Sequence, residues 1–87
     1  MDADKTWKPW YRARSREDIG SAVRKARRRA GHNQAELAGA IGVSRSTVQR
    51  LERGNDVSMQ AFLSATAELG LEAILVPRGA RLEVHAD

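Results

Sequence analysis

The stretch of residues 33–54, NQAELAGAIGVSRSTVQRLERG, constrains the fold more than any other part of the chain. Asn33 is a favourable N-cap, and Glu36 follows it at the spacing of a capping box. Gly42 can adopt the positive φ that a tight turn requires. Between the cap and this glycine, apolar residues recur at helical spacing: Leu37, Ala38 and Ile41. A short helix that ends in a turn is therefore expected here.

A second short helix is expected directly after the turn. Ser44 is a suitable N-cap, and Gly54 is a suitable stop. Val48 and Leu51 are three residues apart and face one way. The face that remains is polar and holds Arg45, Ser46, Gln49 and Arg50. Because such side chains can hydrogen-bond a base edge or a phosphate, this face favours binding to nucleic acid.

The two helices resemble the helix-turn-helix of the Xre and lambdoid phage repressor family. Small, turn, apolar and polar positions match in one register: Gln34, Ala38, Gly42, Val48, Leu51, Glu52 and Gly54. The resemblance implies a mostly α fold, a lambda-repressor-like DNA-binding domain of four to five helices. Its recognition helix, residues 44–53, would enter the major groove of double-stranded DNA. The alternative is a pair of ordinary surface helices with an incidental arginine-rich face.

The polar residues divide into two groups of expected DNA contacts. Base contacts are expected from Arg45, Ser46, Gln49 and Arg50, of which the two arginines would read guanine. Phosphate contacts are expected from Gln34, Ser44, Thr47, Arg53, Arg28 and Arg29. Gln34 would also brace Arg45. In the phage repressors an arginine of the first helix pairs with the glutamate that closes the recognition helix, which here implies an ion pair between Arg27 and Glu52.

Helices are also expected on either side of this motif. Residues 15–30 begin with Ser15 as N-cap, and their inward stripe is Ile19, Ala22, Val23, Ala26 and Ala30. The other faces carry more basic residues than a helix C-terminus needs, which favours phosphate contact: Arg24, Lys25, Arg28 and Arg29. Residues 59–69 follow Ser58 as N-cap, with an apolar set expected in the core: Met59, Phe62, Leu63, Ala65, Thr66 and Leu69.

The end of the chain is expected to hold a short β-strand or hairpin. Residues 71–76 are β-prone, and residues 81–85 alternate polar and apolar side chains after a turn. A strand this apolar would be unfavourable as an unpaired, exposed edge strand. Pairing with the same segment of a second copy is therefore expected. The intersubunit sheet of this homodimer would be formed by Ile74, Leu75 and Val76. The alternative is a hairpin folded back on the preceding helix of the same chain.

The run LGLEAILVPR, residues 69–78, resembles the HipB-type antitoxins, which add a C-terminal strand to the repressor helices. The resemblance implies a transcriptional repressor that binds a pseudo-palindromic operator, autoregulates its operon and neutralises a HipA-like kinase toxin. Two alternatives remain, a stand-alone Xre-family repressor without a toxin and the antitoxin of a RelE-like ribonuclease toxin. A module that binds mainly protein is a third, against which the exposed arginines of the motif argue.

Residues 1–14 form an arm in which aromatic residues crowd beside basic ones: Trp7, Trp10 and Tyr11. Disordered tails have few aromatic residues, so this arm is expected to dock. Three surfaces remain open, namely its own domain, a toxin protein and the minor groove of DNA. The chain thus divides into the arm, a DNA-binding domain at residues 15–70 and a dimerisation segment at residues 71–87.

Charge is unevenly distributed along the chain. Residues 1–53 hold 13 Lys and Arg against 6 Asp and Glu, whereas residues 54–87 hold 2 against 5. A basic half that coincides with the two-helix motif indicates a face that binds a polyanion. The alternative is a merely solvated charged surface.

An enzyme is not expected. The chain has no cysteine, which excludes a thiol nucleophile and a cysteine-ligated zinc. The two histidines, His32 and His85, lack the spacing of metal ligands, so no catalytic residue, metal or cofactor is predicted. The N-terminus lacks the apolar region of a signal peptide, and no apolar run approaches a membrane span. A cytoplasmic protein without a membrane partner is therefore expected.

Overall fold

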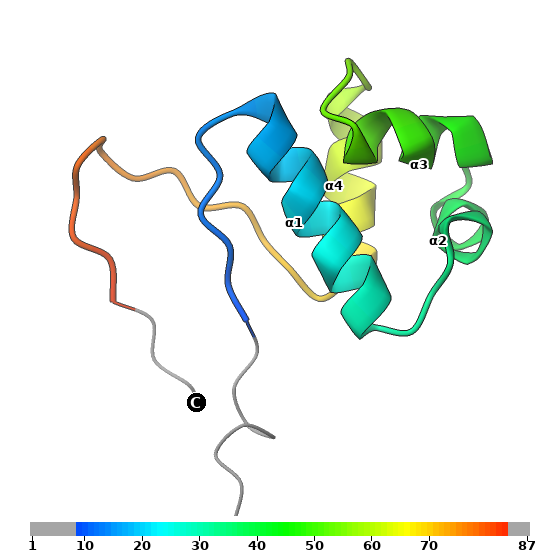
Figure 1. The fold of residues 1–87 in the computed structure, drawn as a ribbon, viewed down its shortest axis with the longest axis horizontal. Helices are drawn as coiled ribbons and strands as arrows, with labels where there is room; N and C mark the ends of the chain where they lie inside the picture. The colour runs from blue at the N-terminus through cyan, green and yellow to red at the C-terminus, as the bar shows by residue number, and fades with distance from the viewer. Residues whose placement is uncertain (1–8, 84–87) are drawn as a thin grey trace, which may run out of the picture.

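Four helices make up the regular structure of the part of the chain described, residues 9–83 of a computed structural model (Figure 1). They are α1 (Arg16–Arg29), α2 (Gln34–Ile41), α3 (Arg45–Glu52) and α4 (Met59–Glu68). In Figure 1, α1 lies in front of α4, and α2 and α3 lie together to one side. The mostly α fold with a helix-turn-helix at α2 and α3 is therefore confirmed. None of the four helices is long and apolar enough to cross a membrane.

Side-chain caps determine where each helix begins. The Asn33 side chain accepts a hydrogen bond from the backbone N–H of Glu36, and the Glu36 side chain accepts one from the backbone N–H of Asn33, both at 2.8 Å. At the start of each of the other three helices, a serine side chain accepts a hydrogen bond from the backbone N–H of the residue three positions later: Ser15, Ser44 and Ser58. Each such cap contributes about 1 kcal/mol, so the predicted helix starts are confirmed by local hydrogen bonds.

The turn between α2 and α3 depends on a glycine. Gly42 has φ 73°, and the next amide, of Val43, donates to the carbonyl of Ala38 at 3.0 Å. A side chain would be strained in this left-handed conformation. The turn brings the buried Ala38 and the apolar face of α3 into one core.

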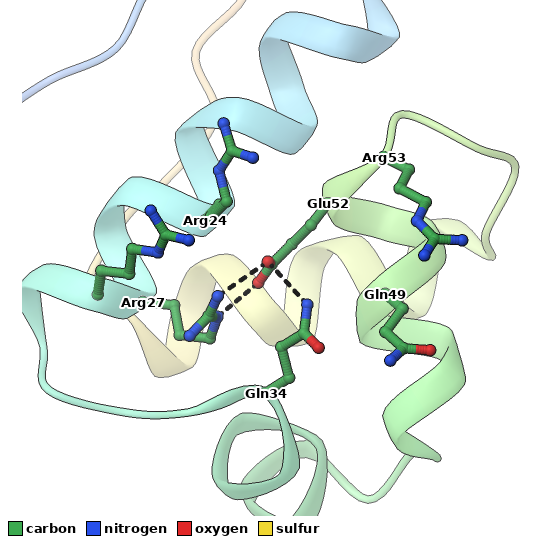
Figure 2. A pocket seen from close by; sticks show the side chains of 7 residues that line it. Arg24, Arg27, Gln34, Gln49, Glu52 and Arg53 are labelled. Atoms are coloured by element: carbon green, nitrogen blue, oxygen red, sulfur yellow. Dashed lines mark hydrogen bonds and ion pairs between the residues drawn. The ribbon is translucent and has the colours of Figure 1, made fainter.

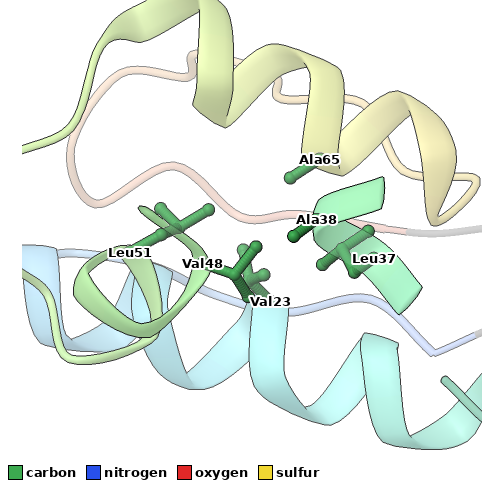
Figure 3. Packing of buried hydrophobic residues seen from close by; sticks show 6 residues of the cluster. All are labelled: Val23, Leu37, Ala38, Val48, Leu51 and Ala65. Carbon is green, nitrogen blue, oxygen red and sulfur yellow. The ribbon is translucent and has the colours of Figure 1, made fainter. Parts of the chain in front are cut away.

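The core lies where all four helices meet (Figure 3). Its buried residues come from every helix: Val23 of α1, Leu37 and Ala38 of α2, Val48 and Leu51 of α3, and Ala65 of α4. The largest side chains that are fully buried are Leu37, Val23 and Val48. This is a small core for a chain of 87 residues, and domains of this size are marginally stable alone.

A glycine in the middle of α1 permits the closest helix contact. A Cβ built on Gly20 would lie 2.5 Å from the backbone oxygen of Glu52 and 2.7 Å from that of Leu51. The backbones of α1 and α3 therefore touch, with no room for a side chain between them. Gly54 makes a similar approach from the loop after α3, where a Cβ would lie 2.9 Å from the backbone nitrogen of Glu17.

Two residues of α4 that were expected in the core are exposed. Met59 is 78% exposed and Leu63 is 49% exposed. The helix instead turns its small residues inward, with Ala61 and Ala65 buried and Thr66 beside them. Small residues let α4 approach its neighbours closely, and this leaves the larger apolar side chains outside. In α1, too, the predicted inward Ala30 is exposed, because it lies beyond the last helical residue.

The predicted C-terminal strand or hairpin is not found in the residues described. Residues 71–83 contain no strand, although the turn between the predicted strands forms, with the amide of Ala80 donating to the carbonyl of Pro77 at 3.0 Å. A strand requires a partner at hydrogen-bonding distance, and no segment of the described chain supplies one. Residues 84 and 85 of the second predicted strand lie outside the described residues. Pairing between two copies stays a prediction.

The contact at Gly20 predicts that Gly20→Ala is destabilising, although alanine is the better helix former by about 1 kcal/mol. The added Cβ has no space against the α3 backbone, so we expect a net loss of about 1–3 kcal/mol in the free energy of unfolding. Gly39→Ala in α2 is the matched control. No atom lies within 4 Å of a Cβ built there, so this variant should gain about 0.5–1 kcal/mol. Urea unfolding measures both, and equal effects would contradict the close approach.

Candidate nucleic-acid interface

A buried ion pair joins α1 to the end of α3 (Figure 2). The guanidinium of Arg27 donates from Nε to Glu52 Oε2 at 2.6 Å and from Nη2 to Glu52 Oε1 at 3.0 Å. Both residues are more than 90% buried. The pairing implied by the resemblance is thus present as a two-point, buried contact, the geometry in which arginine and carboxylate bind most strongly.

The same pair also holds the start of α2. Gln34 Nε2 donates to Glu52 Oε1 at 3.1 Å, and Arg27 Nη1 donates to the carbonyl of His32 at 2.8 Å. Hydrogen bonding to Glu52 raises the pKa of Arg27, against the opposing effect of burial. Gln34 therefore braces the ion pair, and no hydrogen bond between Gln34 and Arg45 occurs in the described residues.

A hollow surrounds this ion pair, and we call it the basic pocket. It is lined, besides the pair itself, by Arg24, Arg28, Gln34, Gln49 and Arg53 (Figure 2). Glu52 is the one acidic residue among them, and Arg27 balances its charge. Within residues 9–83 no ion pair involves the other three arginines. The pocket is therefore strongly positive, and its lining comes from α1, α2, α3 and the C-cap of α3.

The structure groups some of the predicted phosphate ligands and separates others. Arg28, Gln34 and Arg53 line the basic pocket, whereas Arg29 does not. Arg24 lines it too, as one of the basic residues of α1 for which phosphate contact was favoured. Its spacing of four residues from Arg28 places both on one face of α1, and this spacing was the available signal. The predicted base-contact residue Gln49 also lies at this pocket.

The remaining predicted base contacts lie on the outer side of α3. Arg45, Ser46 and Arg50 are exposed, whereas Val48 and Leu51 of the same helix are buried. At the start of the helix, Ser44 Oγ caps the amide of Thr47 at 3.2 Å. The same oxygen lies 2.9 Å from Ser46 Oγ and 3.0 Å from Thr47 Oγ1. Three hydroxyl groups are thus held together at the N-terminus of α3.

The described part of the arm lies along α1, away from α2 and α3 (Figure 1). The backbone amide of Arg14 donates to Asp18 Oδ2 at 2.9 Å, which ties the arm to the first turn of the helix. Trp10 and Tyr11 border a shallow hollow on α1, and Trp10 remains 46% exposed. Trp7, the third aromatic residue predicted to contact a toxin, lies outside the described residues.

No group of three or more histidine, cysteine, aspartate or glutamate side chains able to hold a metal ion occurs between residues 9 and 83.

Burial of the ion pair predicts a large cost for removing one partner. Arg27→Met would leave Glu52 buried and uncompensated, so we expect a loss of about 3–5 kcal/mol in the free energy of unfolding. The double variant Arg27→Met with Glu52→Leu should recover most of this loss, because apolar groups can replace a buried pair. Urea unfolding measures each variant.

The control is the exposed ion pair of Arg16 and Asp56, which has the same 2.6 Å separation but side chains 66% and 92% exposed. Asp56→Ala should cost no more than about 1 kcal/mol. If Arg27→Met cost as little as this control, the two-point contact would not be a major source of stability.

The comparisons with known proteins agree with this arrangement of helices. The family model for the helix-turn-helix domain matches residues 18–77. A HipB–O2 20-mer complex superposes with a TM-score of 0.72 at 24% identity, over 80% of this chain and 99% of that one. A HipA–HipB–O2–O3 complex gives 0.71 at 23% identity, over 79% and 99%.

A further similar structure is the restriction-modification controller protein C.AhdI from Aeromonas hydrophila, with a TM-score of 0.61 and 33% identity over 66% of this chain and 84% of that one. No curated protein sequence matches this chain. Because the family model covers more than half of the sequence, this chain belongs to the helix-turn-helix domain family, and its four helices have the fold found in HipB.

Proposed function

We propose that this protein is a sequence-specific DNA-binding repressor. The observation that carries the proposal is the position of the exposed polar face of α3 beside a pocket lined by arginines that form no ion pair among the described residues. One side of α3 is fixed in the core, so the other side is presented on a rigid support. This is what reading a base sequence requires, because phosphate contacts position the protein and side chains in the groove specify the bases.

In this proposal α3 lies in the major groove. Arg45 and Arg50 bind guanines through two hydrogen bonds each, worth about 1–3 kcal/mol of discrimination apiece. Ser46 and Gln49 add smaller polar contacts. Since Gln49 lies at the edge of the basic pocket, it is the base-reading residue nearest to the phosphate backbone.

The basic pocket receives the DNA backbone. Arg24, Arg28 and Arg53 provide the charge, and the Gln34 amide, already oriented by Glu52, has a second N–H to donate. The remaining phosphate contacts are assigned to Ser44, Thr47 and Arg29. Each phosphate that an arginine neutralises releases counterions, so affinity should fall steeply as salt rises.

The repressor acts as a homodimer in the cytoplasm. Two recognition helices bind half-sites about one helical turn, or ~34 Å, apart on a pseudo-palindromic operator. The two copies pair through Ile74, Leu75 and Val76, which are exposed and lie in no strand within residues 9–83.

The protein is further proposed to be an antitoxin that autoregulates its operon and neutralises a HipA-like kinase. The fold it shares with the HipB of a HipA–HipB–O2–O3 complex supports this. So does the exposure of Trp10 at a hollow that shares no lining residue with the basic pocket, so that a protein bound there could leave the basic pocket free. The alternatives are a repressor without a toxin and an antitoxin of a RelE-like ribonuclease.

The division between base and phosphate contacts predicts different effects for two arginines. Arg45→Ala should lose about 1–3 kcal/mol of discrimination at particular base pairs. Arg24→Ala should weaken binding to all duplexes alike and reduce the slope of log K against log salt by about one. Fluorescence anisotropy on duplexes selected from a random library, over a range of salt, measures both.

Lys25→Ala serves as the control for these variants, because Lys25 is an exposed cation of α1 that lies at the hollow beside the arm instead of the basic pocket. It should change neither quantity appreciably. If all three substitutions lowered affinity and the salt slope equally, the groove assignment would be wrong.

The antitoxin role predicts a protein partner that does not depend on DNA. A pull-down of the tagged protein from its native cytosol after nuclease treatment should retain a kinase-sized protein in stoichiometric amount. Trp10→Ala should reduce its recovery, while Arg45→Ala should not. Recovery of DNA alone, at every salt concentration, would remove the antitoxin assignment and leave the repressor.

A further inference from the structure

The Ser44 hydroxyl at the start of α3 is the common hydrogen-bond partner of its two neighbours, Ser46 and Thr47. Ser44 Oγ accepts from the backbone N–H of Thr47 at 3.2 Å. It also lies 2.9 Å from Ser46 Oγ and 3.0 Å from Thr47 Oγ1, and in both contacts either hydroxyl can be the donor. In the function proposed above, Ser46 contacts a base whereas Thr47 contacts a phosphate. Ser44 therefore connects a residue that reads the base sequence with one that binds the DNA backbone.

A count of hydrogen atoms limits what these three hydroxyl groups can offer to DNA. A hydroxyl group has one hydrogen to donate and two lone pairs that accept. One lone pair of Ser44 is taken by the amide of Thr47, which leaves one lone pair and one hydrogen for two hydroxyl neighbours. Ser44 must therefore donate to one neighbour and accept from the other. The neighbour that donates to Ser44 has no hydrogen left, so only the other neighbour can donate outward.

Contact with a phosphate selects one of these two arrangements. Phosphate oxygens accept hydrogen bonds, so a phosphate contact from Thr47 requires its hydroxyl hydrogen to point outward. Thr47 must then receive the hydrogen of Ser44, and Ser46 must donate into the remaining lone pair of Ser44. In the opposite arrangement Thr47 would turn a lone pair toward the phosphate oxygen, which is repulsive. The Ser44 side chain keeps no hydrogen for a phosphate and acts as a positioning residue, so a phosphate contact of Ser44 falls to its backbone amide.

We propose that Ser44 couples the phosphate contact of Thr47 to Ser46 and thereby makes Ser46 a hydrogen-bond acceptor at the base that it reads. The proposal rests on the repressor function above and adds the chemical group that is recognised. In the major groove the exocyclic amino groups of adenine and cytosine donate, whereas guanine N7 and O6 and thymine O4 accept. Ser46 thus recognises an amino group. Because every base pair carries one such group, Ser46 determines which strand of its base pair carries the adenine or cytosine.

The arginines that flank Ser46 cannot read this group. Arg45 and Arg50 carry only donors, so they fit the acceptors on the edge of guanine. Glu52 is the only acidic residue within residues 44–53, and it is buried in the ion pair with the first helix. Ser46 is exposed. An acceptor at this position therefore supplies what the arginines lack, and the same face of α3 can read both kinds of base edge.

The test begins with selection of duplexes from a random library by the full chain and by Ser46→Ala. The position at which Ser46→Ala loses its preference identifies the base that Ser46 reads. Wild type should prefer adenine or cytosine there. Removing only the amino group of that base from the duplex should weaken wild-type binding by about threefold to tenfold, as measured by fluorescence anisotropy.

Thr47→Val is the decisive variant, because valine has nearly the shape of threonine but no hydroxyl. Ser44 can then donate to Ser46 or accept from it, so Ser46 regains a hydrogen to donate. Binding to all duplexes should weaken, and the penalty for the missing amino group should fall below about twofold. Thr47→Ser keeps the hydroxyl and should keep the penalty. Arg28→Ala is the control, because it removes a phosphate contact that has no hydroxyl link to Ser46, and it should also keep the penalty.

A preference for guanine or thymine at the position read by Ser46 would overturn the proposal, and so would an unchanged penalty in Thr47→Val. Thr47→Ala removes the same hydroxyl and repeats the test if circular dichroism shows that valine disturbs α3. Wild-type preferences in Ser46→Ala would mean that Ser46 reads no base, which also overturns the proposal. In each of these cases the selected duplexes leave the repressor function standing. Failure to select any duplex would instead reject DNA binding itself, and the proposal with it.

Discussion

The buried contact between Arg27 and Glu52 is the interaction on which the relative positions of α1, α2 and α3 depend. Its two hydrogen bonds join α1 to the end of α3, and Gln34 connects the start of α2 to the same carboxylate. A buried charge is costly unless it is paired. Separating the three helix segments would therefore either expose the charges of this pair to solvent or leave one of them buried without a partner. The ion pair therefore holds the arginines of the basic pocket close to one another, although their positive charges repel.

Glycine makes this contact possible. Gly20 lets the α1 backbone touch the backbone of Leu51 and of the buried Glu52 itself at the end of α3. Around this contact, the surface of the molecule has a basic part and an apolar part. Arginines that form no ion pair within residues 9–83 surround the pair of Arg27 and Glu52, whereas exposed apolar residues gather on α4 and the segment after it. The two surfaces therefore differ in chemical character, one basic and the other apolar.

Much of the fold was predictable because its signals are local. The caps at Asn33 and Ser44 act through hydrogen bonds within a few residues, and Gly42 stops α2 through its own backbone conformation. The partnership of Arg27 and Glu52 came from resemblance to a family, since 25 residues of chain separate them. Most of the candidate site followed from the exposed face of α3. Which basic residues of α1 lie at the pocket did not, because that depends on where α1 lies against α3.

The sequence by itself determined the four helices, their ends and the polar face of α3, because each rests on contacts between near neighbours in the chain. Only the tertiary structure decided which face of α4 is buried. Met59 and Leu63 repeat at helical spacing as well as Ala61 and Ala65 do, and the close approach of neighbouring helices selects the smaller pair. It also decided that residues 71–83 form no strand within one chain, since a strand exists only where a second one meets it at hydrogen-bonding distance.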